Sequence, residues 1–360
     1  MYYALEGPWI PSIADLENPC NEWTFLNIRG GLPRVSCGGM TAAGMEQMQM
    51  IYSVVKCRTD YSLICDASGV VKYINISLHE IHGTIPPEIS LLTGLSVLDL
   101  RGQFLSGKLP TEIGLMNDLT MMDASWNENL AGSVPSEIGN LSQLLNLRLD
   151  VTTLSGPIPR EISRLSKLEV LSLQWTELSG QIPSGLFLLP NLRHLWHSSR
   201  DTADLTAFTV PNEIGLLTNL RSLQLNDVVG TIPTSLGLLT NLHDLHLQGI
   251  LKKPGVSSTL PTEIGRLTSL HELKFGNQLN GNIPTEFALL SRLRRCDLAG
   301  NSLSATLPNS LGILTSFSPI EFDPVKLMEM ANYSRILNMS VYNESGNVSS
   351  PLYTCFLYIH

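Results

Sequence analysis

The chain has 360 residues, a formal charge of −9 at pH 7 and only 15% charged residues. Its 43% apolar content and mean hydropathy of +0.11 argue against a disordered chain, and no stretch has the roughly 18 unbroken apolar residues of a membrane helix. The acidic balance and a pI of 5.4 leave no basic field for phosphate backbones or anionic lipid, so we expect neither nucleic acid nor a membrane surface as a partner.

A short motif that ends in an aliphatic residue and proline recurs down most of the chain, and successive motif prolines lie 22 to 28 residues apart. A period near 24 residues predicts one solenoid of stacked units in place of several globular domains. The ten motif prolines are Pro86, Pro110, Pro135, Pro159, Pro183, Pro211, Pro233, Pro261, Pro284 and Pro308.

Each unit opens with alternating leucines, as in Leu168-x-x-Leu171-x-Leu173, which predicts a short strand with one apolar face. The leucines expected to form one continuous core are Leu171, Leu173, Leu195, Leu223, Leu225, Leu245 and Leu247. A glycine precedes the proline by three residues in seven of the ten copies, namely Gly83, Gly107, Gly132, Gly156, Gly180, Gly230 and Gly281.

The proline itself favours a short helical or 3₁₀ turn, because its φ is already fixed for one. A glutamate follows the proline by two residues in seven copies, where it would meet the positive end of the turn's dipole. These residues are Glu88, Glu112, Glu137, Glu161, Glu213, Glu263 and Glu286, and they account for much of the acidic excess without any partner.

Residues 95–110 read Leu-x-x-Leu-x-Leu-x-x-Gln-x-Leu-x-Gly-x-Leu-Pro, and this pattern resembles the plant-type leucine-rich repeat over residues 57–317. The resemblance implies an α/β repeat solenoid, a horseshoe with a parallel concave β-sheet and a convex side of 3₁₀ or short helices. The asparagine position of the pattern keeps Asn127, Asn277 and Asn301, but other copies have Gln103, Thr152 or Thr176. The hydrogen-bond ladder of that position is therefore expected to be partial.

The same resemblance implies an N-terminal cysteine cap over residues 1–69, a solenoid over 70–317 and a C-terminal cap or tail over 318–360. It also implies two disulfides, Cys57–Cys65 and Cys20–Cys37, although four cysteines allow three pairings between which the sequence does not choose. Cys296 replaces a core leucine, and we expect it to be a small buried hydrophobe.

Clustered cysteines near one end fit an oxidising compartment, so the chain is expected outside the cell or at its surface. Residues 1–30 nevertheless hold neither a basic nor an apolar signal region, so no signal peptide is visible and the chain could be part of a membrane-anchored parent. Six glycosylation sequons start at Asn75, Asn140, Asn332, Asn338, Asn343 and Asn347. Four of them lie in the tail, which is either a glycosylated cap or stalk or a disordered end rich in Asn and Ser.

Motifs for catalysis are not found: the sequence has no phosphate-binding Gly-Lys-Ser/Thr loop, no kinase segment, no H-E-x-x-H and no serine nucleophile elbow. His194 and His197 lie three apart on an expected strand, so they point to opposite faces and cannot share a metal. His197 takes a leucine position and is interpreted as a tolerated core or edge residue. We therefore expect no enzyme, no cofactor and no metal site.

Residues between the strand leucines point out from the concave face, and the central outward column is varied. It reads Asn75, Asp99, Asp123, Arg148, Ser172, Trp196, Gln224, His246, Lys274 and Asp297. Such variety fits a protein or glycan surface and not a regular ice-binding face. Trp126, Trp175 and Trp196 are expected in outward positions, where each either anchors a partner or lies flat against a neighbouring strand.

Two copies are longer, and their extra residues contain Asp201, Asp204, Lys252 and Lys253. Insertions of this kind map to one rim of a solenoid and often line a binding site, but here they could also form only a surface salt bridge. The predicted ligand-binding residues are these four together with Trp126, Trp175, Trp196, Gln224 and His246.

These observations predict a non-catalytic, receptor-like recognition module that binds a protein, peptide or glycan on its concave face and one rim. Two alternatives stay open. One is a secreted inhibitor of a cell-wall-degrading enzyme, resembling polygalacturonase-inhibiting proteins. The other is an intracellular scaffold, which would need reduced cap cysteines.

Overall fold

The computed structural model describes residues 62–66, 70–77, 81–200, 208–249, 258–276, 279–298 and 301–303. The chain divides into two compact units, Met1–Ser179 and Gly180–His360, and each is described by itself. This division lies inside the predicted solenoid and was not expected from the sequence. The predicted boundaries at 69/70 and 317/318 stay predictions.

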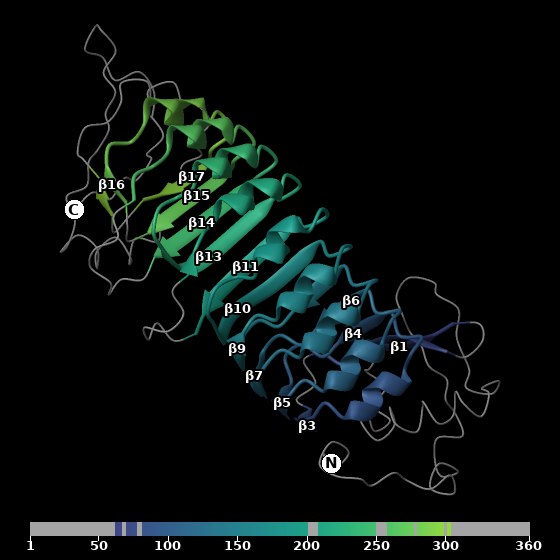
Figure 1. The fold of residues 1–360 in the computed structure, drawn as a ribbon. Coiled ribbons are helices and arrows are strands. Elements are labelled where there is room, and N and C mark those ends of the chain that lie inside the picture. Colours follow the sequence, from purple (N-terminus) through teal and green to yellow (C-terminus); the bar gives the residue numbers. More distant parts are fainter. Residues whose placement is uncertain are drawn as a thin grey trace, which may run out of the picture. The chain divides into compact units, whose positions relative to one another are not determined.

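Short parallel strands, one from each repeat, form the sheet of the first unit (Figure 1). Its strands are β2 (Val71–Asn75), β4 (Val97–Asp99), β6 (Met121–Asp123), β8 (Asn146–Arg148) and β10 (Val170–Ser179). The register aligns the core side chains, so Leu98 pairs with Met122 and Leu147 with Leu171, and each of the four is fully buried. A further strand, β1 (Ser62–Cys65), pairs antiparallel to β2 at the start of the sheet.

A second row of strand pairs follows the first in each repeat. It consists of β3 (His82–Thr84), β5 (Phe104–Gly107), β7 (Asn127–Gly132), β9 (Thr152–Pro157) and the end of β10. The seven glycines predicted from the motif all have positive φ, from 71° to 118°. Glycine adopts this backbone without steric cost, which explains why the chain turns there.

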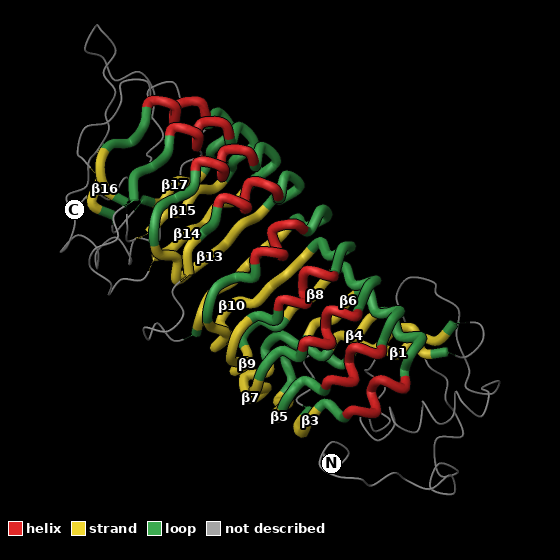
Figure 2. The backbone as a smooth tube through the Cα atoms, viewed as in Figure 1, coloured by secondary structure: helices red, strands yellow, loops and turns green. Residues whose placement is uncertain are grey.

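The motif prolines precede five-residue 3₁₀ helices, which stack along one side of the first unit (Figure 2). They are η4 (Pro87–Leu91), η5 (Thr111–Leu115), η6 (Ser136–Asn140) and η7 (Arg160–Arg164). The predicted glutamates lie in their first turns, as they do in the corresponding turns of the second unit. No helical segment in the described part of the chain is long and apolar enough to cross a membrane.

The second unit repeats this plan. Its strands are β11 (His194–Ser199), β12 (Phe208–Thr209), β13 (Ser222–Val229), β14 (Asp244–Gly249), β15 (Glu272–Gly276), β16 (Asn280–Gly281), β17 (Arg295–Asp297) and β18 (Ser302–Leu303). Its 3₁₀ helices are η8 (Ser184–Leu188), η9 (Asn212–Leu216), η10 (Thr234–Leu238), η11 (Thr262–Arg266) and η12 (Thr285–Leu289).

The core of the second unit follows one register line, which runs through Leu195, Leu223, Leu245, Leu273 and Cys296. Cys296 is 6% exposed, which confirms the predicted buried position. The other predicted core leucines, Leu171, Leu173, Leu225 and Leu247, are also at most 4% exposed. The leucine-rich-repeat solenoid predicted from the sequence is thus the observed fold.

The asparagine position forms the partial ladder that was expected. The side chain of Asn127 accepts from Leu105 N–H at 3.1 Å and donates to Leu100 O at 3.0 Å, so it links two neighbouring repeats. Gln103 and Asn301 make the same kind of link. Thr152 donates only within its own repeat, to Leu149 O at 2.9 Å, because the shorter side chain cannot span two repeats.

Candidate functional site

The open face of each sheet, which is the face opposite the apolar core, carries the predicted outward column. In the second unit the strand register joins Trp196 to Gln224, Gln224 to His246, His246 to Lys274 and Lys274 to Asp297. We name these five residues the central row. The sequence-based phase of the strands is therefore correct, and Trp196, Gln224 and His246 are neighbours as expected.

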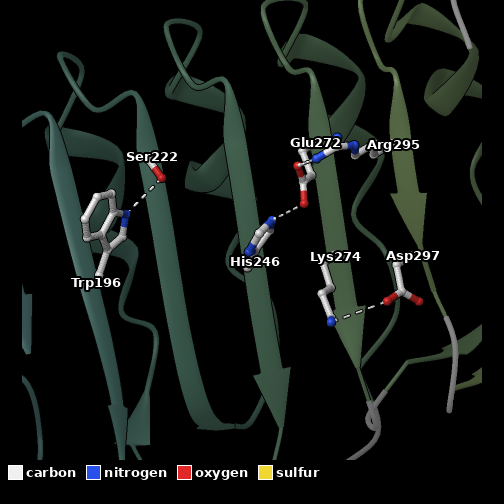
Figure 3. Close-up of polar contacts among 7 residues, drawn as sticks. All are labelled: Trp196, Ser222, His246, Glu272, Lys274, Arg295 and Asp297. Atoms are coloured by element: carbon white, nitrogen blue, oxygen red, sulfur yellow. Dashed lines mark hydrogen bonds and ion pairs between the residues drawn. The ribbon is translucent and has the colours of Figure 1, made fainter. Parts of the chain in front are cut away.

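Trp196 is half-buried on the open face, where it contacts Ser222 (Figure 3) and the ring of His194. Its indole Nε1–H donates to Ser222 Oγ on β13 at 2.9 Å. The His194 ring, two residues earlier on the same strand, packs edge-on at 5.4 Å between centroids. The side chain is thus fixed against the sheet and still presents part of its ring to solvent.

A histidine–carboxylate hydrogen bond and two ion pairs order the other end of the central row (Figure 3). His246 Nε2 lies 3.1 Å from Glu272 Oε1, and Arg295 Nη1 lies 3.2 Å from Glu272 Oε2. Lys274 Nζ lies 3.5 Å from Asp297 Oδ2. These side chains are partly exposed, so the pairs add little to stability, but they set a fixed pattern of charge beside Gln224.

His197 belongs to the core and not to the site. It is 3% exposed and packs edge-on against Phe208 at 5.4 Å between ring centroids. Burial lowers the pKa of its imidazole to about 4, because charging the ring would place a cation among apolar side chains. The expectation of a core residue at this leucine position is confirmed.

A basic row runs along the start of the strands in the second unit. Its backbone groups are bonded in succession, with Arg221 N–H donating to Arg193 O, His243 to Arg221, His271 to His243 and Arg294 to His271. The His243 and His271 rings meet edge-on at 5.1 Å. Burial, and then the charges of His243 and Arg294, lower the pKa of His271, although Asp244 opposes the shift.

Carboxylates occupy the open face of the first unit. Asp99 and Asp123 are neighbours in the central column and are 7% and 3% exposed. Asp123 Oδ1 accepts from the backbone N–H of Ser125 at 2.9 Å, and Asp99 Oδ1 accepts from Arg101 N–H at 3.1 Å. Burial raises the pKa of Asp99, and the charge of Asp123 adds to the rise. The hydrogen bond from Arg101 N–H and the charge of Arg101 offset part of it.

Asp150 joins this group from the next repeat. Its Oδ1 accepts from Ser172 Oγ and from Gln174 N–H at 2.8 Å, and its Oδ2 lies 3.5 Å from Ser125 Oγ. Burial raises the pKa of Asp150, although both bonds to Oδ1 favour the charged form. The bonded N–H groups belong to Arg101, Ser125 and Gln174, which stand two residues after the central column, so these carboxylates fix the backbone at that point of each repeat.

The two exposed tryptophans of the first unit stand three residues after the central column, Trp126 in a bend after β6 and Trp175 within β10. Trp126, Val151 and Trp175 occupy the same position of consecutive repeats and have φ of 60°, 54° and 55°. For residues other than glycine this left-handed backbone costs about 1–2 kcal/mol. Trp126 lies between β6 and β7 and not within a strand, so its expected strand position is corrected. Trp126 is 59% and Trp175 60% exposed.

Several predicted residues lie outside the described residues. They are Asp201, Asp204, Lys252, Lys253, Cys20, Cys37, Cys57, Asn332, Asn338, Asn343 and Asn347, together with the side chain of Cys65. The described residues contain no group of His, Cys, Asp and Glu that could hold a metal ion. Both disulfides and the tail glycans stay predictions.

The other two sequons differ in accessibility. Asn140 is exposed at the end of η6. Asn75 is half-buried on β2, where its Oδ1 accepts from both the N–H and the hydroxyl of Ser77.

The sequence pattern did not single out Asp150 and Val151, because both lie outside the central column. A usable signal existed: Gly102 stands at the position of Trp126, Val151 and Trp175 in the preceding repeat and also has positive φ, at 68°. A glycine in one copy of a repeat position indicates that the other copies adopt the same left-handed backbone.

Residues 135–253 match the family model described as a leucine-rich repeat region. The brassinosteroid LRR receptor kinase BRI1 of Oryza sativa subsp. japonica is 31% identical over 146 residues, which are 39% of this chain and 13% of that protein. The structure of PEPR1 with AtPEP1 is similar at 27% identity and a TM-score of 0.54, covering 72% of this chain and 43% of that chain.

The LRR ectodomain of the plant membrane receptor kinase GASSHO1/SCHENGEN3 from Arabidopsis thaliana, in complex with CASPARIAN STRIP INTEGRITY FACTOR 2, is also similar. It shows 25% identity and a TM-score of 0.53, covering 71% of this chain and 39% of that chain. The chain spans less than half the length of each of these three relatives. The chain thus has a leucine-rich-repeat fold and is similar to these proteins in fold and in repeat sequence.

Proposed function

We propose that the protein is a non-catalytic recognition module, receptor-like and extracellular or at the cell surface, that binds a protein or peptide on the open face of its sheet. The central row carries this proposal, because five different side chains stand in register on adjacent strands. A flat sheet that presents an aromatic ring, an amide and fixed charges can distinguish ligands by shape and by charge.

Trp196 is the proposed anchor of this site. Its indole is oriented by Ser222, so little conformational entropy is lost when a ligand covers the ring. Gln224 would form hydrogen bonds with the backbone of the ligand. His246 and Glu272 would hold a polar group at one end of the ligand. Asp201, Asp204, Lys252 and Lys253 belong to the insertions that would form the rim of the site.

The similar structures support a peptide or protein ligand. Among them PEPR1 was solved with AtPEP1, and the GASSHO1/SCHENGEN3 ectodomain with CASPARIAN STRIP INTEGRITY FACTOR 2. A binding role for the solenoid is therefore the function that this fold and face support best.

The test is capture of partners from a secreted protein and peptide fraction by the immobilised full chain, compared among variants. Trp196→Ala should weaken capture of a true partner at least 30-fold, which corresponds to about 2 kcal/mol. Leu216→Ala removes a more exposed apolar side chain from η9, on the other side of the second unit, and should change nothing. Equal capture by both variants, with unchanged melting temperature, would place the site elsewhere.

Two further measurements separate the alternatives. Inhibition of pectin-degrading enzymes by the full chain would favour the secreted inhibitor. Free thiols at Cys57 and Cys65 in natively produced protein, counted under denaturing and non-reducing conditions, would favour the intracellular scaffold.

A further inference from the structure

Trp126, Val151 and Trp175, named here the tryptophan row, combine backbone strain with solvent exposure. The fold does not require either tryptophan, because Gly102 fills the same position one repeat earlier with the same sign of φ. Residues other than glycine with strained backbone cluster at functional sites, where the surrounding structure holds the strain. The row is therefore a candidate contact surface, separate from the central row of the second unit.

Hydrogen bonds between successive turns fix the spacing of the row. Gly102 N–H donates to Ser125 O at 2.9 Å, Trp126 N–H to Asp150 O at 2.7 Å and Val151 N–H to Gln174 O at 2.8 Å. The turns thus continue the ladder of parallel strands, whose neighbours lie about 4.8 Å apart. Two steps place Trp126 and Trp175 about 10 Å apart.

This distance matches a polyproline II helix better than a β-strand. In polyproline II every third residue returns to the same side after about 9 Å. In an extended strand, residues on one side recur after about 7 Å or 13 Å, and neither fits. Exposed aromatic rings are also the usual receptor for such helices, because the rigid ligand loses little entropy on binding.

The surroundings of the row are acidic. Glu128 and Glu177 are exposed and each follows a tryptophan of the row by two residues. Asp123 and Asp150 lie near the row, and the base Arg148, which is paired with Asp123 in the sheet register, offsets part of their charge. Indole faces and carboxylates together favour a cationic ligand, and arginine can also stack on tryptophan.

We propose that the tryptophan row docks a proline-rich segment in the polyproline II conformation, with arginine or lysine side chains directed to Glu128, Asp150 and Glu177. This inference rests on the proposed recognition function and names the class of partner for a second surface, on the open face of the first unit. Val151 would contact the residues between the two anchored positions.

The experiment measures binding of the full chain to the fluorescein-labelled peptide acetyl-(Pro-Pro-Arg)₃-amide by fluorescence anisotropy. Trp126→Gly and Trp175→Gly should each weaken binding at least ten-fold. Both variants should melt at the wild-type temperature or above, because glycine adopts the positive φ without strain. Glu128→Gln with Glu177→Gln should weaken binding about five-fold and reduce its salt dependence.

Matched peptides and variants decide the interpretation. The peptide (Gly-Ser-Arg)₃ has the same charge without the helix, and (Pro-Pro-Glu)₃ has the helix with the opposite charge, so both should bind at least ten-fold more weakly. Leu115→Ala removes a comparably exposed side chain from η5 and should have no effect. Equal binding of (Gly-Ser-Arg)₃, no binding of (Pro-Pro-Arg)₃, or displacement of the peptide by cellohexaose would each overturn the proposal, the last in favour of a glycan surface.

The experiments distinguish a failure of the tryptophan row as a docking surface from a failure of the proposed function. Partners captured through Trp196 should still bind when Trp126 and Trp175 are glycine. If such capture persists while (Pro-Pro-Arg)₃ does not bind, only the tryptophan row is refuted. If the peptide binds through the row but Trp196→Ala changes no capture, the site on the central row is wrong.

Discussion

His197 shows how one residue couples the core to pH. The unfolded imidazole has a pKa near 6.5 and the folded one about 4, so between these values the unfolded state binds more protons. Stability should therefore fall as the pH falls through this window. Asp99, Asp150 and Asp227 act in the opposite sense, because burial raises their pKa values and acidification relieves the cost of their charge.

We expect His197→Leu to remove the histidine contribution, since leucine is the residue that the repeat places there. Between pH 7.5 and pH 5 the wild type should lose about 2 kcal/mol more stability than the variant. Denaturant titrations of both proteins at the two pH values give this difference, and the shared carboxylates cancel from it. Parallel curves for the two proteins would mean that the imidazole is not protonated on unfolding.

Leu223 and Gln224 test the strand phase at adjacent positions. Leu223 is fully buried in the register line of the core, whereas Gln224 lies on the open face. Leu223→Ala should cost about 2–5 kcal/mol, and Gln224→Ala under about 0.5 kcal/mol. Chemical denaturation of both variants measures the two losses of stability. Comparable losses would contradict the observed alternation of buried and open-face side chains.

At the scale of the element, the 3₁₀ helices pack more closely than the sequence indicated. The ideal Cβ position of Gly139 lies 2.3 Å from Glu161 O of the next repeat, and Gly114, Gly237 and Gly265 meet a backbone oxygen in the same way. Glycine at this position lets consecutive turns stack backbone on backbone. This glycine belongs to the recurring Glu-Ile-Gly run. The spacing of the run from the proline predicts the turn itself but not its contact with the turn of the next repeat.

Gly139→Ala should therefore destabilise the protein by about 1–3 kcal/mol, because a rigid backbone atom and not a movable side chain blocks the methyl group. Gly180→Ala is the matched comparison. Its φ is +83° with nothing within 4 Å of the added atom, so its cost is conformational alone, about 1 kcal/mol. Melting curves of both variants should rank Gly139→Ala as the more damaging, and the reverse order would refute close stacking of the turns.

The period-24 pattern was sufficient to predict the strands, the turns, the core leucines and the positions of the motif glycines, because each repeats with the stacking geometry. The antiparallel strand β1 was not expected, since it occurs once and has no repeat to reveal it. For the candidate site, the sequence predicted only which residues share a column on the open face. Which side chain binds to which, as in Trp196 with Ser222, depends on rotamers that no repeat pattern encodes.

At the scale of the whole molecule, the open faces and the turn sides carry different chemistry. The proposed binding residues, the ion pairs of Glu272 and Asp297, and the carboxylates of Asp99, Asp123 and Asp150 lie on open faces. The turn sides present the exposed leucines of the 3₁₀ helices, Leu91, Leu115, Leu188, Leu216, Leu238 and Leu289. A secreted protein with this arrangement can bear glycans on its turn sides without covering a binding surface.

The two described sequons test this separation. Asn140 is exposed at the end of η6, whereas the side chain of Asn75 is already bonded to Ser77 on the open face. A glycan on Asn75 would disturb these bonds and cover the first strands of the sheet. We therefore expect the full chain, folded and secreted from a eukaryotic host, to carry a glycan at Asn140 and none at Asn75.

Intact mass before and after enzymatic deglycosylation gives the number of glycans in each variant. Asn140→Gln should lose one glycan and leave the melting temperature unchanged, because the side chain points to solvent. Asn75→Gln should lose no glycan and should destabilise the start of the sheet, since glutamine cannot reproduce the short bonds to Ser77. Asn117→Gln, in an exposed turn without a sequon, is the control. A glycan found at Asn75 would mean that the open face of the first unit is covered there, which would restrict any ligand to the repeats that follow.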